Sequence, residues 1–255
     1  MKTLSAETKE WLQWVRLTSH PLKRITEGSF KGGIGSAALV DYRGRRFALM
    51  ARHVVQPDQD GWVLDIGTLS REGLAVHHLG ICHYILQVRP STPDVAIIDF
   101  SFAEVPKGLN TFFQERTPRF QGEVVARHVF ETELSDGPTL DNVYAFSGEI
   151  KPEQLGDSES FLFQPVVYPG LKYLRSEHEF DIFKLPVSHP GHAEFRGCSG
   201  APIVGMDRRP VALLVDGIED NNTVRGVSLR HCRPALDIYC DHQDVPDLQA
   251  AAAKG

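Results

Sequence analysis

The strongest local signal in the sequence lies in residues 197–202, which read Gly-Cys-Ser-Gly-Ala-Pro and are followed by the apolar pair Ile203-Val204. A glycine on each side of the Cys-Ser pair lets the chain turn tightly and bring its backbone close to a substrate. If the turn directs the amides of Gly197 and Ser199 to one point, they form an oxyanion hole beside the serine hydroxyl. Serine is a weak nucleophile unless a base takes its proton. The turn therefore predicts a histidine elsewhere in the chain, oriented by a carboxylate.

Both residue types occur at expected strand ends. Residues 47–55 read FALMARHVV, an apolar strand that delivers His53 at its C-terminal end. Residues 93–98 read PDVAII, in which Asp94 opens another apolar strand. A carboxylate between apolar neighbours is costly to bury unless it accepts a hydrogen bond, so we predict that Asp94 orients His53. Asp99 competes for this role, and we interpret it instead as a solvated charge at the end of the strand.

The three segments, in the order His, Asp, Ser, resemble the signatures of the chymotrypsin/trypsin family of serine proteases. Residues 51–54 are similar to the family's T-A-A-H segment, residues 94–98 to its D-(I/V)-A-L-L strand, and residues 197–202 to its G-D-S-G-G-P turn. Residues 33–37 and 142–148 resemble the opening strands of its two barrels. The resemblance covers about residues 30–240 and is strongest for bacterial members that lack disulfides.

The resemblance implies a trypsin-like serine endopeptidase that hydrolyses peptide bonds through an acyl-enzyme on Ser199. His53 would act first as general base and then as general acid. Asp94 would fix the tautomer of His53, and the amides of Gly197 and Ser199 would hold the oxyanion. No cofactor is implied.

The resemblance also indicates where substrate binds. Leu214, Val215 and Asp216 fall where the family pairs the substrate backbone as an added strand. Ala193 falls at the base of the primary pocket, which predicts an uncharged floor and favours an apolar or small side chain. Glu194 or His231 in the pocket wall would reverse that preference.

Three residues depart from the family pattern. Cys198 stands where digestive members carry the aspartate that receives a newly cut N-terminus, so activation by clipping is not expected. Arg52 and Ala201 replace small residues beside His53 and after the serine turn. Both bear on the width of the cleft and leave the three catalytic residues in place.

The architecture predicted is all-β, with two antiparallel six-stranded β-barrels and helices at the N- and C-terminus. An all-β sandwich fits the number of strands nearly as well. We divide the chain into a helical extension (1–29), a first barrel with the His and Asp (30–120), a second barrel with the nucleophile (121–232) and a C-terminal helix and tail (233–255). Ser5 is predicted to cap a helix over residues 6–17, and further helices are expected over 234–239 and 246–253.

Composition limits the partners. The 255 residues include 27 Lys and Arg against 33 Asp and Glu, a net charge of −6, which argues against a nucleic-acid binder. No apolar run approaches the ~20 residues of a membrane-spanning helix, and the N-terminus lacks the apolar core of a secretory signal. Four cysteines are too few for a disulfide scaffold. We therefore expect a cytoplasmic protein that acts on a protein or peptide substrate, without a membrane.

The cysteines and the remaining histidines are not predicted to carry catalysis or to bind a metal. Viral relatives of this fold use a cysteine nucleophile, but at the position that Ser199 occupies here, so Cys198 is interpreted as a loop thiol. A metal site could be drawn from His77, His78, Cys82 and His83, yet no second pair with ligand spacing lies nearby, so no metal is predicted. Cys232 and Cys240 are interpreted as free thiols.

Two alternatives to a self-sufficient protease stay open. The chain could be a catalytically silent chymotrypsin-fold module that binds peptide or protein, for which Arg52 crowding His53 is the one sequence feature. It could also be a subunit that a regulatory protein partner activates. The helix with Trp11 and Trp14 and the connection over residues 103–141 offer surface for such a partner.

Overall fold

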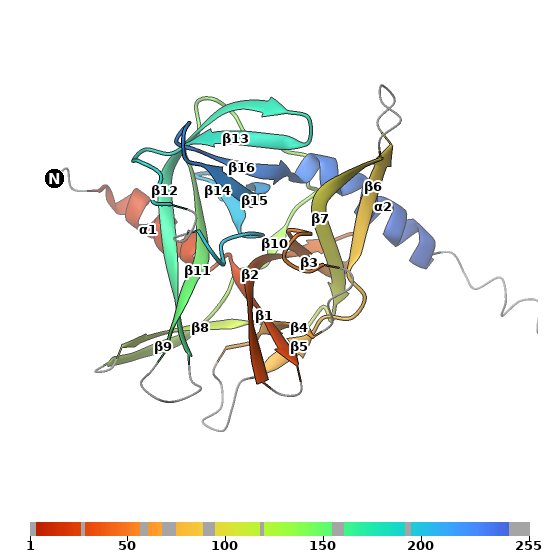
Figure 1. Ribbon diagram of the computed structural model, residues 1–255, viewed down its shortest axis with the longest axis horizontal. Helices are drawn as coiled ribbons and strands as arrows, with labels where there is room; N and C mark the ends of the chain where they lie inside the picture. Colours follow the sequence, from red (N-terminus) through yellow and green to blue (C-terminus); the bar gives the residue numbers. More distant parts are fainter. Residues whose placement is uncertain are drawn as a thin grey trace, which may run out of the picture.

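The computed structural model describes residues 4–26, 29–56, 61–67, 75–88, 95–117, 120–154, 161–191 and 195–244. Two β units lie side by side, a curled sheet and a closed barrel, and a helix lies at each end of the chain (Figure 1). The predicted all-β class with terminal helices is confirmed.

The curled sheet has eight strands in the order β5-β4-β1-β2-β3-β7-β6, with β10 paired to β2. Their bounds are β1 His20–Thr26, β2 Ser29–Tyr42, β3 Arg45–Met50, β4 Trp62–Asp65, β5 Val76–His78, β6 His83–Val88, β7 Val95–Val105 and β10 Phe130–Glu131. The sequence predicted a six-stranded barrel over residues 30–120. The structure differs because β1, from the expected helical extension, and β10, from the expected second barrel, both pair with β2.

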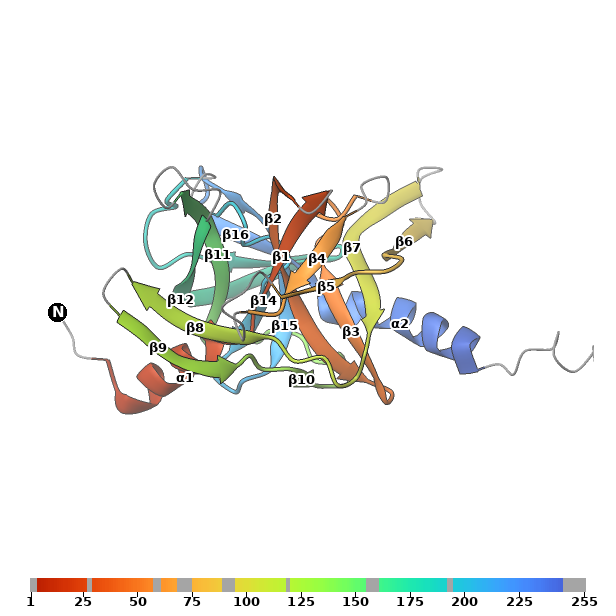
Figure 2. The ribbon, with the colours of Figure 1, turned by 90° about the horizontal axis from the view of Figure 1, so that it is seen from below.

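The second unit is a closed six-stranded barrel in the order β11-β12-β13-β16-β15-β14, as the sequence predicted. Its strands are β11 Tyr144–Gln154, β12 Phe161–Glu177, β13 Phe180–Lys184, β14 Pro202–Gly205, β15 Pro210–Ile218 and β16 Thr223–Ser228. A separate hairpin, β8 Phe112–Thr117 with β9 Phe120–Ala126, lies between β7 and β10 in the chain and extends on the side of α1 (Figure 2).

The N-terminal helix packs mainly on the closed barrel, whereas the C-terminal helix contacts both units. In α1, Ala6–Arg16, the hydroxyl of Ser5 accepts a hydrogen bond from the Thr8 amide at 3.1 Å, which confirms the predicted cap. The buried Trp11 donates its indole N–H to the Gly205 carbonyl of the closed barrel at 2.9 Å. α2, Leu229–Asp244, includes the helix expected over 234–239 and places Tyr239 against Phe47 of the curled sheet. The helix expected over 246–253 lies outside the described residues.

The core lies in three layers because the central strands bury both faces. In β3, Phe47 and Leu49 point into a layer between the two units, whereas Ala48 and Met50 fill the curled sheet. β15 divides in the same way, with alternate residues in the layer between the units and inside the closed barrel. Continuous apolar runs follow from burial on both faces. β3 and β15 therefore both border the apolar layer between the units.

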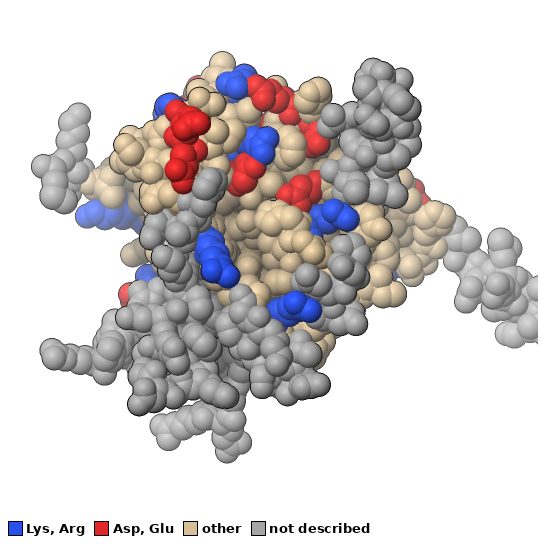
Figure 3. All heavy atoms as spheres, viewed as in Figure 1, with Lys and Arg blue, Asp and Glu red and all other residues tan. Residues whose placement is uncertain are grey.

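The face seen in Figure 3 carries acidic and basic side chains interspersed, without one broad basic surface. None of the helices among the described residues is long and apolar enough to cross a membrane.

Candidate active site

His53 lies three residues after the end of β3 and is held by one carboxylate. Asp99 on β7 accepts the backbone N–H of His53 at 2.8 Å through Oδ1. Its second oxygen, Oδ2, lies 2.7 Å from His53 Nδ1. A carboxylate accepts hydrogen bonds, so Nδ1 carries the proton and Nε2 keeps its lone pair. His53 is thus oriented as a base.

The carboxylate in contact with His53 is Asp99, so the interpretation of Asp99 as a solvated charge at the end of the strand was wrong. In the β3–β7 ladder Met50 pairs with Ser101. Continued along the antiparallel strands, this register brings residue 52 opposite residue 99. Asp94 itself lies outside the described residues.

The two partners change each other's pKa. The hydrogen bond to Asp99 and that group's charge, with a further contribution from the charge of Asp216, raise the pKa of His53 against the opposing effect of burial. Burial acts to raise the pKa of Asp99, but the hydrogen bonds from His53 and the charges of His53 and Arg52 outweigh it and lower that pKa. Asp99 therefore stays ionised while His53 titrates.

The serine turn lies against the curled sheet. Gly200 has φ +89°, and a Cβ built there would overlap the carbonyl oxygen of Ser36 and lie 3.2 Å from the Ala51 nitrogen. Gly197 has φ +97°, a region that favours glycine. Because Gly200 follows Ser199 and Ala51 precedes His53 by two residues, the close backbone approach brings the serine turn and the His53 segment together.

The turn leaves two amides unused. The amides of Cys198, Gly200 and Ala201 donate to carbonyls of Phe195, Leu214 and Cys198 at 2.9, 2.7 and 2.9 Å. No described residue accepts from the amides of Gly197 and Ser199. These are the two donors that the sequence nominated for an oxyanion hole, and their role stays a prediction.

The hydroxyl of Ser199 donates to the carbonyl of Val215 at 3.2 Å. Among the described residues no hydrogen bond joins it to His53. Proton transfer to His53 therefore requires rotation about the Cα–Cβ bond of Ser199. Catalytic hydrogen bonds are often long or misaligned before substrate binds.

A pocket of about 380 Å³ opens beside Ser199. The sequence-predicted residues Leu214, Val215 and Asp216 line it together with Phe195, Arg196, Ser199 and Gly217. Ala193, expected at its floor, lies outside the described residues. Phe195, Arg196 and Gly217 were missed by sequence reasoning, although the first two directly precede the serine turn.

Known structures share this arrangement of strands. No protein-family model matches the chain, and no curated protein matches it. A serine endoprotease from Yersinia pestis superposes with a TM-score of 0.52 at 8% identity, over 92% of this chain and 67% of that one. For neuropsin, a serine protease of mouse brain, the TM-score is 0.55 at 11% identity, over 89% and 96% of the two chains. A scabies mite inactivated protease paralogue gives 0.54 at 10%, over 95% and 97%.

The chain has the chymotrypsin-like protease fold. At these identities the likeness shows the fold alone, and it confirms the resemblance found in the sequence at that level.

Within this chymotrypsin-like fold, an ion pair borders the pocket. Arg225 on β16 contacts both carboxylate oxygens of Asp216, one of them through Nε at 2.8 Å. The Arg225 guanidinium also lies 5.1 Å from the centre of the Phe180 ring. The hydrogen bond to Asp216 raises the pKa of Arg225. The charge of Asp216 is thus largely matched within the protein.

The positive charge of Arg52, the neighbour of His53 in the chain, packs against an aromatic ring. Its guanidinium lies 5.0 Å from the centre of the Tyr84 ring on β6, a cation–π arrangement. Its charge contributes to lowering the pKa of Asp99. The arginine that replaces a small residue of the family motif therefore supports the ionised carboxylate.

The remaining cysteines and histidines form no second site. Cys198 is fully buried, and a Cβ at Gly148 would lie 2.5 Å from its sulfur, so the thiol is packed inside the closed barrel. Cys232 and Cys240 are buried free thiols on α2. In the part of the chain that the structure describes, no three potential ligands gather at one point to hold a metal.

Proposed function

We propose that this protein is a serine endopeptidase that uses Ser199, His53 and Asp99. The observation that carries the proposal is the pair of hydrogen bonds from His53 N–H and Nδ1 to Asp99, which leaves Nε2 as a base at the boundary with the serine turn. A serine in a glycine-flanked turn with two unused amides supports the same function.

Acylation follows from the groups present. His53 Nε2 takes the hydroxyl proton as Ser199 Oγ attacks the carbonyl carbon of the scissile peptide. The carbonyl oxygen becomes an oxyanion, which the amides of Gly197 and Ser199 stabilise. His53 then gives its proton to the leaving amine, the C–N bond breaks, and an ester to Ser199 remains. Asp99 stays ionised and stabilises the imidazolium during this step.

Deacylation repeats the same sequence with water as the nucleophile. His53 takes a proton from water, the hydroxide attacks the ester, and the proton returns to Ser199 Oγ as the acid product leaves. During both steps the backbone of the substrate would lie along Leu214, Val215 and Asp216 as an added strand. The side chain before the scissile bond would enter the pocket beside Ser199.

A second candidate is a silent or partner-activated module with the same fold. The hydrogen bond from Ser199 to the Val215 carbonyl, in place of one to His53, favours it. A structural neighbour described as an inactivated protease paralogue has the same fold. The sequence offers Trp11 and Trp14 as surface for an activating partner. The structure gives this argument less support, because Trp11 is 3% exposed and Trp14 stacks on His128 with ring centres 5.0 Å apart.

Fluorophosphonate labelling separates the two candidates, since only an activated serine is phosphonylated. The labelling is read by intact mass on wild type, Ser199→Ala and His53→Ala. One adduct on wild type and none on either variant supports the protease. Folded wild type without an adduct overturns a self-sufficient protease and leaves the module.

We further propose a cytoplasmic location. All four cysteines are free thiols and three of them are buried, an arrangement that suits a reducing compartment. The proposed partner is a protein or peptide substrate.

A further inference from the structure

Arg196 forms part of the wall of the pocket beside Ser199. It is exposed and lies directly before Gly197, the first residue of the serine turn. Any side chain that enters this pocket from a bound acyl group therefore passes close to a guanidinium. No other basic residue lines the pocket among those described.

The charge of Arg196 is not matched within the described part of the chain. It makes no hydrogen bond or ion pair with a described residue. The one acidic residue among the described pocket residues is Asp216, and both of its oxygens contact Arg225. Glu219 is not among the lining residues, and its Oε1 lies 4.0 Å from His189 Nδ1. Among the described residues, the pocket therefore presents one positive charge without a carboxylate partner.

The other described walls are mostly apolar. Phe195, Leu214 and Val215 are 7%, 2% and 8% exposed. The ring of His189 packs edge-on against Phe195, with ring centres 4.6 Å apart. These walls suit the methylene groups of a side chain, while the guanidinium suits an anionic end. A glutamate side chain has both parts, whereas a lysine would bring a like charge to Arg196.

We propose that Arg196 is a specificity-determining residue that selects substrates with an acidic side chain, glutamate above all, directly before the scissile bond. This inference rests on the proposed protease function and assigns a substrate class to the same site. It replaces the preference for apolar or small side chains that the sequence indicated through Ala193.

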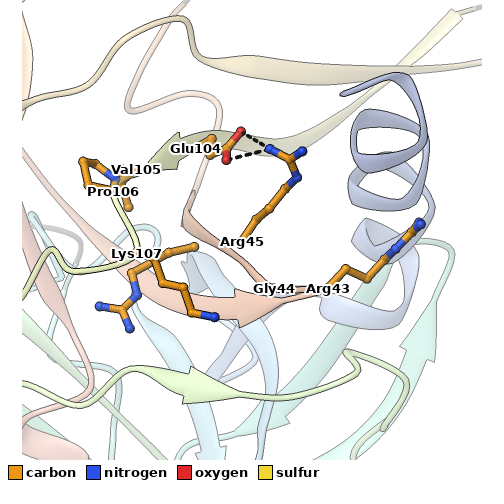
Figure 4. Close-up of a pocket in the computed structure, with 8 residues that line it drawn as sticks. Arg43, Gly44, Arg45, Glu104, Val105, Pro106 and Lys107 are labelled. Carbon is orange, nitrogen blue, oxygen red and sulfur yellow. Dashed lines mark hydrogen bonds and ion pairs between the residues drawn. The ribbon is translucent and has the colours of Figure 1, made fainter. Parts of the chain in front are cut away.

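A larger pocket elsewhere in the protein is lined by cations that mostly have carboxylate partners. It measures about 720 Å³, and Figure 4 shows it lined by Arg43, Gly44, Arg45, Arg46, Glu104, Val105, Pro106 and Lys107, at the end of β3 remote from His53. Three of its cations have carboxylate partners, in the pairs Arg45–Glu104, Arg46–Asp41 and Arg43–Asp241 at 3.0, 2.7 and 2.7 Å. Lys107 is exposed and makes no ion pair with a described residue, so it serves as a control cation.

The test compares succinyl-Ala-Ala-Pro-Xaa p-nitroanilides in which Xaa is Glu, Gln, Leu or Lys. For wild type we expect kcat/KM to be about fivefold higher for Glu than for its neutral isostere Gln, and lowest for Lys. Arg196→Gln should remove the Glu-to-Gln ratio, and Arg196→Glu should reverse the order of Glu and Lys. Lys107→Gln removes one positive charge far from the pocket and should leave every ratio unchanged.

Fluorophosphonate labelling of each variant separates the two levels of the proposal. If wild type and Arg196→Gln are labelled at equal rates but the Glu-to-Gln ratio does not change, the specificity inference is overturned and the protease stands. A wild-type preference for Lys or Leu over Glu overturns it equally. If wild type is not labelled, the protease function fails. The specificity inference is then tested by calorimetric binding of the Glu and Lys substrates to Ser199→Ala. A preference for Glu that Arg196→Gln abolishes supports the inference, and equal binding overturns it.

Discussion

The backbone amide of Ser36 donates a hydrogen bond to the carbonyl of Ser199 at 2.9 Å. The Ser36 hydroxyl also donates to the carbonyl of Gly197 at 2.8 Å, and Ser36 is fully buried. A residue of β2 in the curled sheet thus holds the serine turn of the closed barrel at two points. The position of Ser199 relative to His53 depends on this contact between the two units.

Gly200→Ala should prevent the serine turn from docking on the curled sheet. A Cβ at this position overlaps the carbonyl oxygen of Ser36, and the φ of +89° adds backbone strain. We expect a loss of at least about 2 kcal/mol of unfolding free energy, measured by urea denaturation, together with loss of fluorophosphonate labelling. Gly44→Ala is the matched control, because Gly44 also has positive φ but nothing lies within 4 Å of its Cβ position. Equal effects of both variants would show that backbone strain alone accounts for the loss.

Ser36→Ala should weaken the turn without displacing the backbone. It removes the hydroxyl that donates to the buried Gly197 carbonyl, so we expect a loss of about 1–2 kcal/mol of unfolding free energy. Because Gly197 carries one of the two proposed oxyanion donors, kcat should fall while KM changes little. Steady-state kinetics on the best p-nitroanilide measure this split. An unchanged kcat would show that the Gly197 carbonyl contact does not position the amide.

Asp99→Asn should reduce kcat/KM by about 10⁴-fold, the scale that loss of the orienting carboxylate has in this type of mechanism. An asparagine cannot accept both His53 N–H and Nδ1–H with full negative charge, so the correct tautomer and the stabilised imidazolium are lost. Asp94→Asn should leave kcat/KM within about twofold, since Asp99 already holds both N–H groups of His53. The opposite result, with Asp94→Asn inactive and Asp99→Asn active, would restore the assignment made from sequence.

The mistaken interpretation of Asp99 shows how far sequence reasoning reaches in this chain. The serine turn and His53 follow from local patterns, because flanking glycines and a histidine at a strand end can be recognised in the sequence without tertiary information. The choice between Asp94 and Asp99 depends on the register between β3 and β7, which pairs Met50 with Ser101 across about fifty residues of chain. Arg196 was missed for a similar reason, since its lack of a partner among the described residues is a property of three-dimensional contacts. The contacts of α1 with the closed barrel through Trp11 and of α2 with the curled sheet through Tyr239 are likewise set by tertiary packing.

Activity should rise with pH through the pKa of His53, because the mechanism needs the neutral imidazole. The hydrogen bond to Asp99 raises that pKa above 6.5, so kcat/KM should be half-maximal above pH 6.5. The stabilisation that the His53–Asp99 pair contributes to the fold depends on pH in the opposite direction. It is fully present below the unfolded pKa of the histidine and is lost as pH rises through the folded pKa. A pH profile with a midpoint at or below 6.5 would contradict the role of Asp99.

His20 should make the fold sensitive to acid. It is fully buried on β1, where burial first and the charge of Arg127 second lower its pKa to about 3. His20 Nε2 lies 2.9 Å from the carbonyl of His128 and therefore donates, while Nδ1 lies 2.6 Å from the Thr111 hydroxyl and accepts. The folded protein thus holds His20 neutral, whereas the unfolded chain binds a proton below about pH 6.5.

Because the unfolded state binds the extra proton, unfolding free energy should fall as pH drops, by about 1.4 kcal/mol per unit between pH 6.5 and about 3 from this residue alone. His20→Gln keeps a neutral amide that donates to the His128 carbonyl and cannot take up the proton. Urea denaturation at pH 7 and pH 5 should therefore show a loss about 2 kcal/mol larger for wild type than for His20→Gln. His78→Gln, an exposed histidine on β5, is the control and should keep the wild-type loss. Equal losses for wild type and His20→Gln would mean that His20 is protonated in the folded protein.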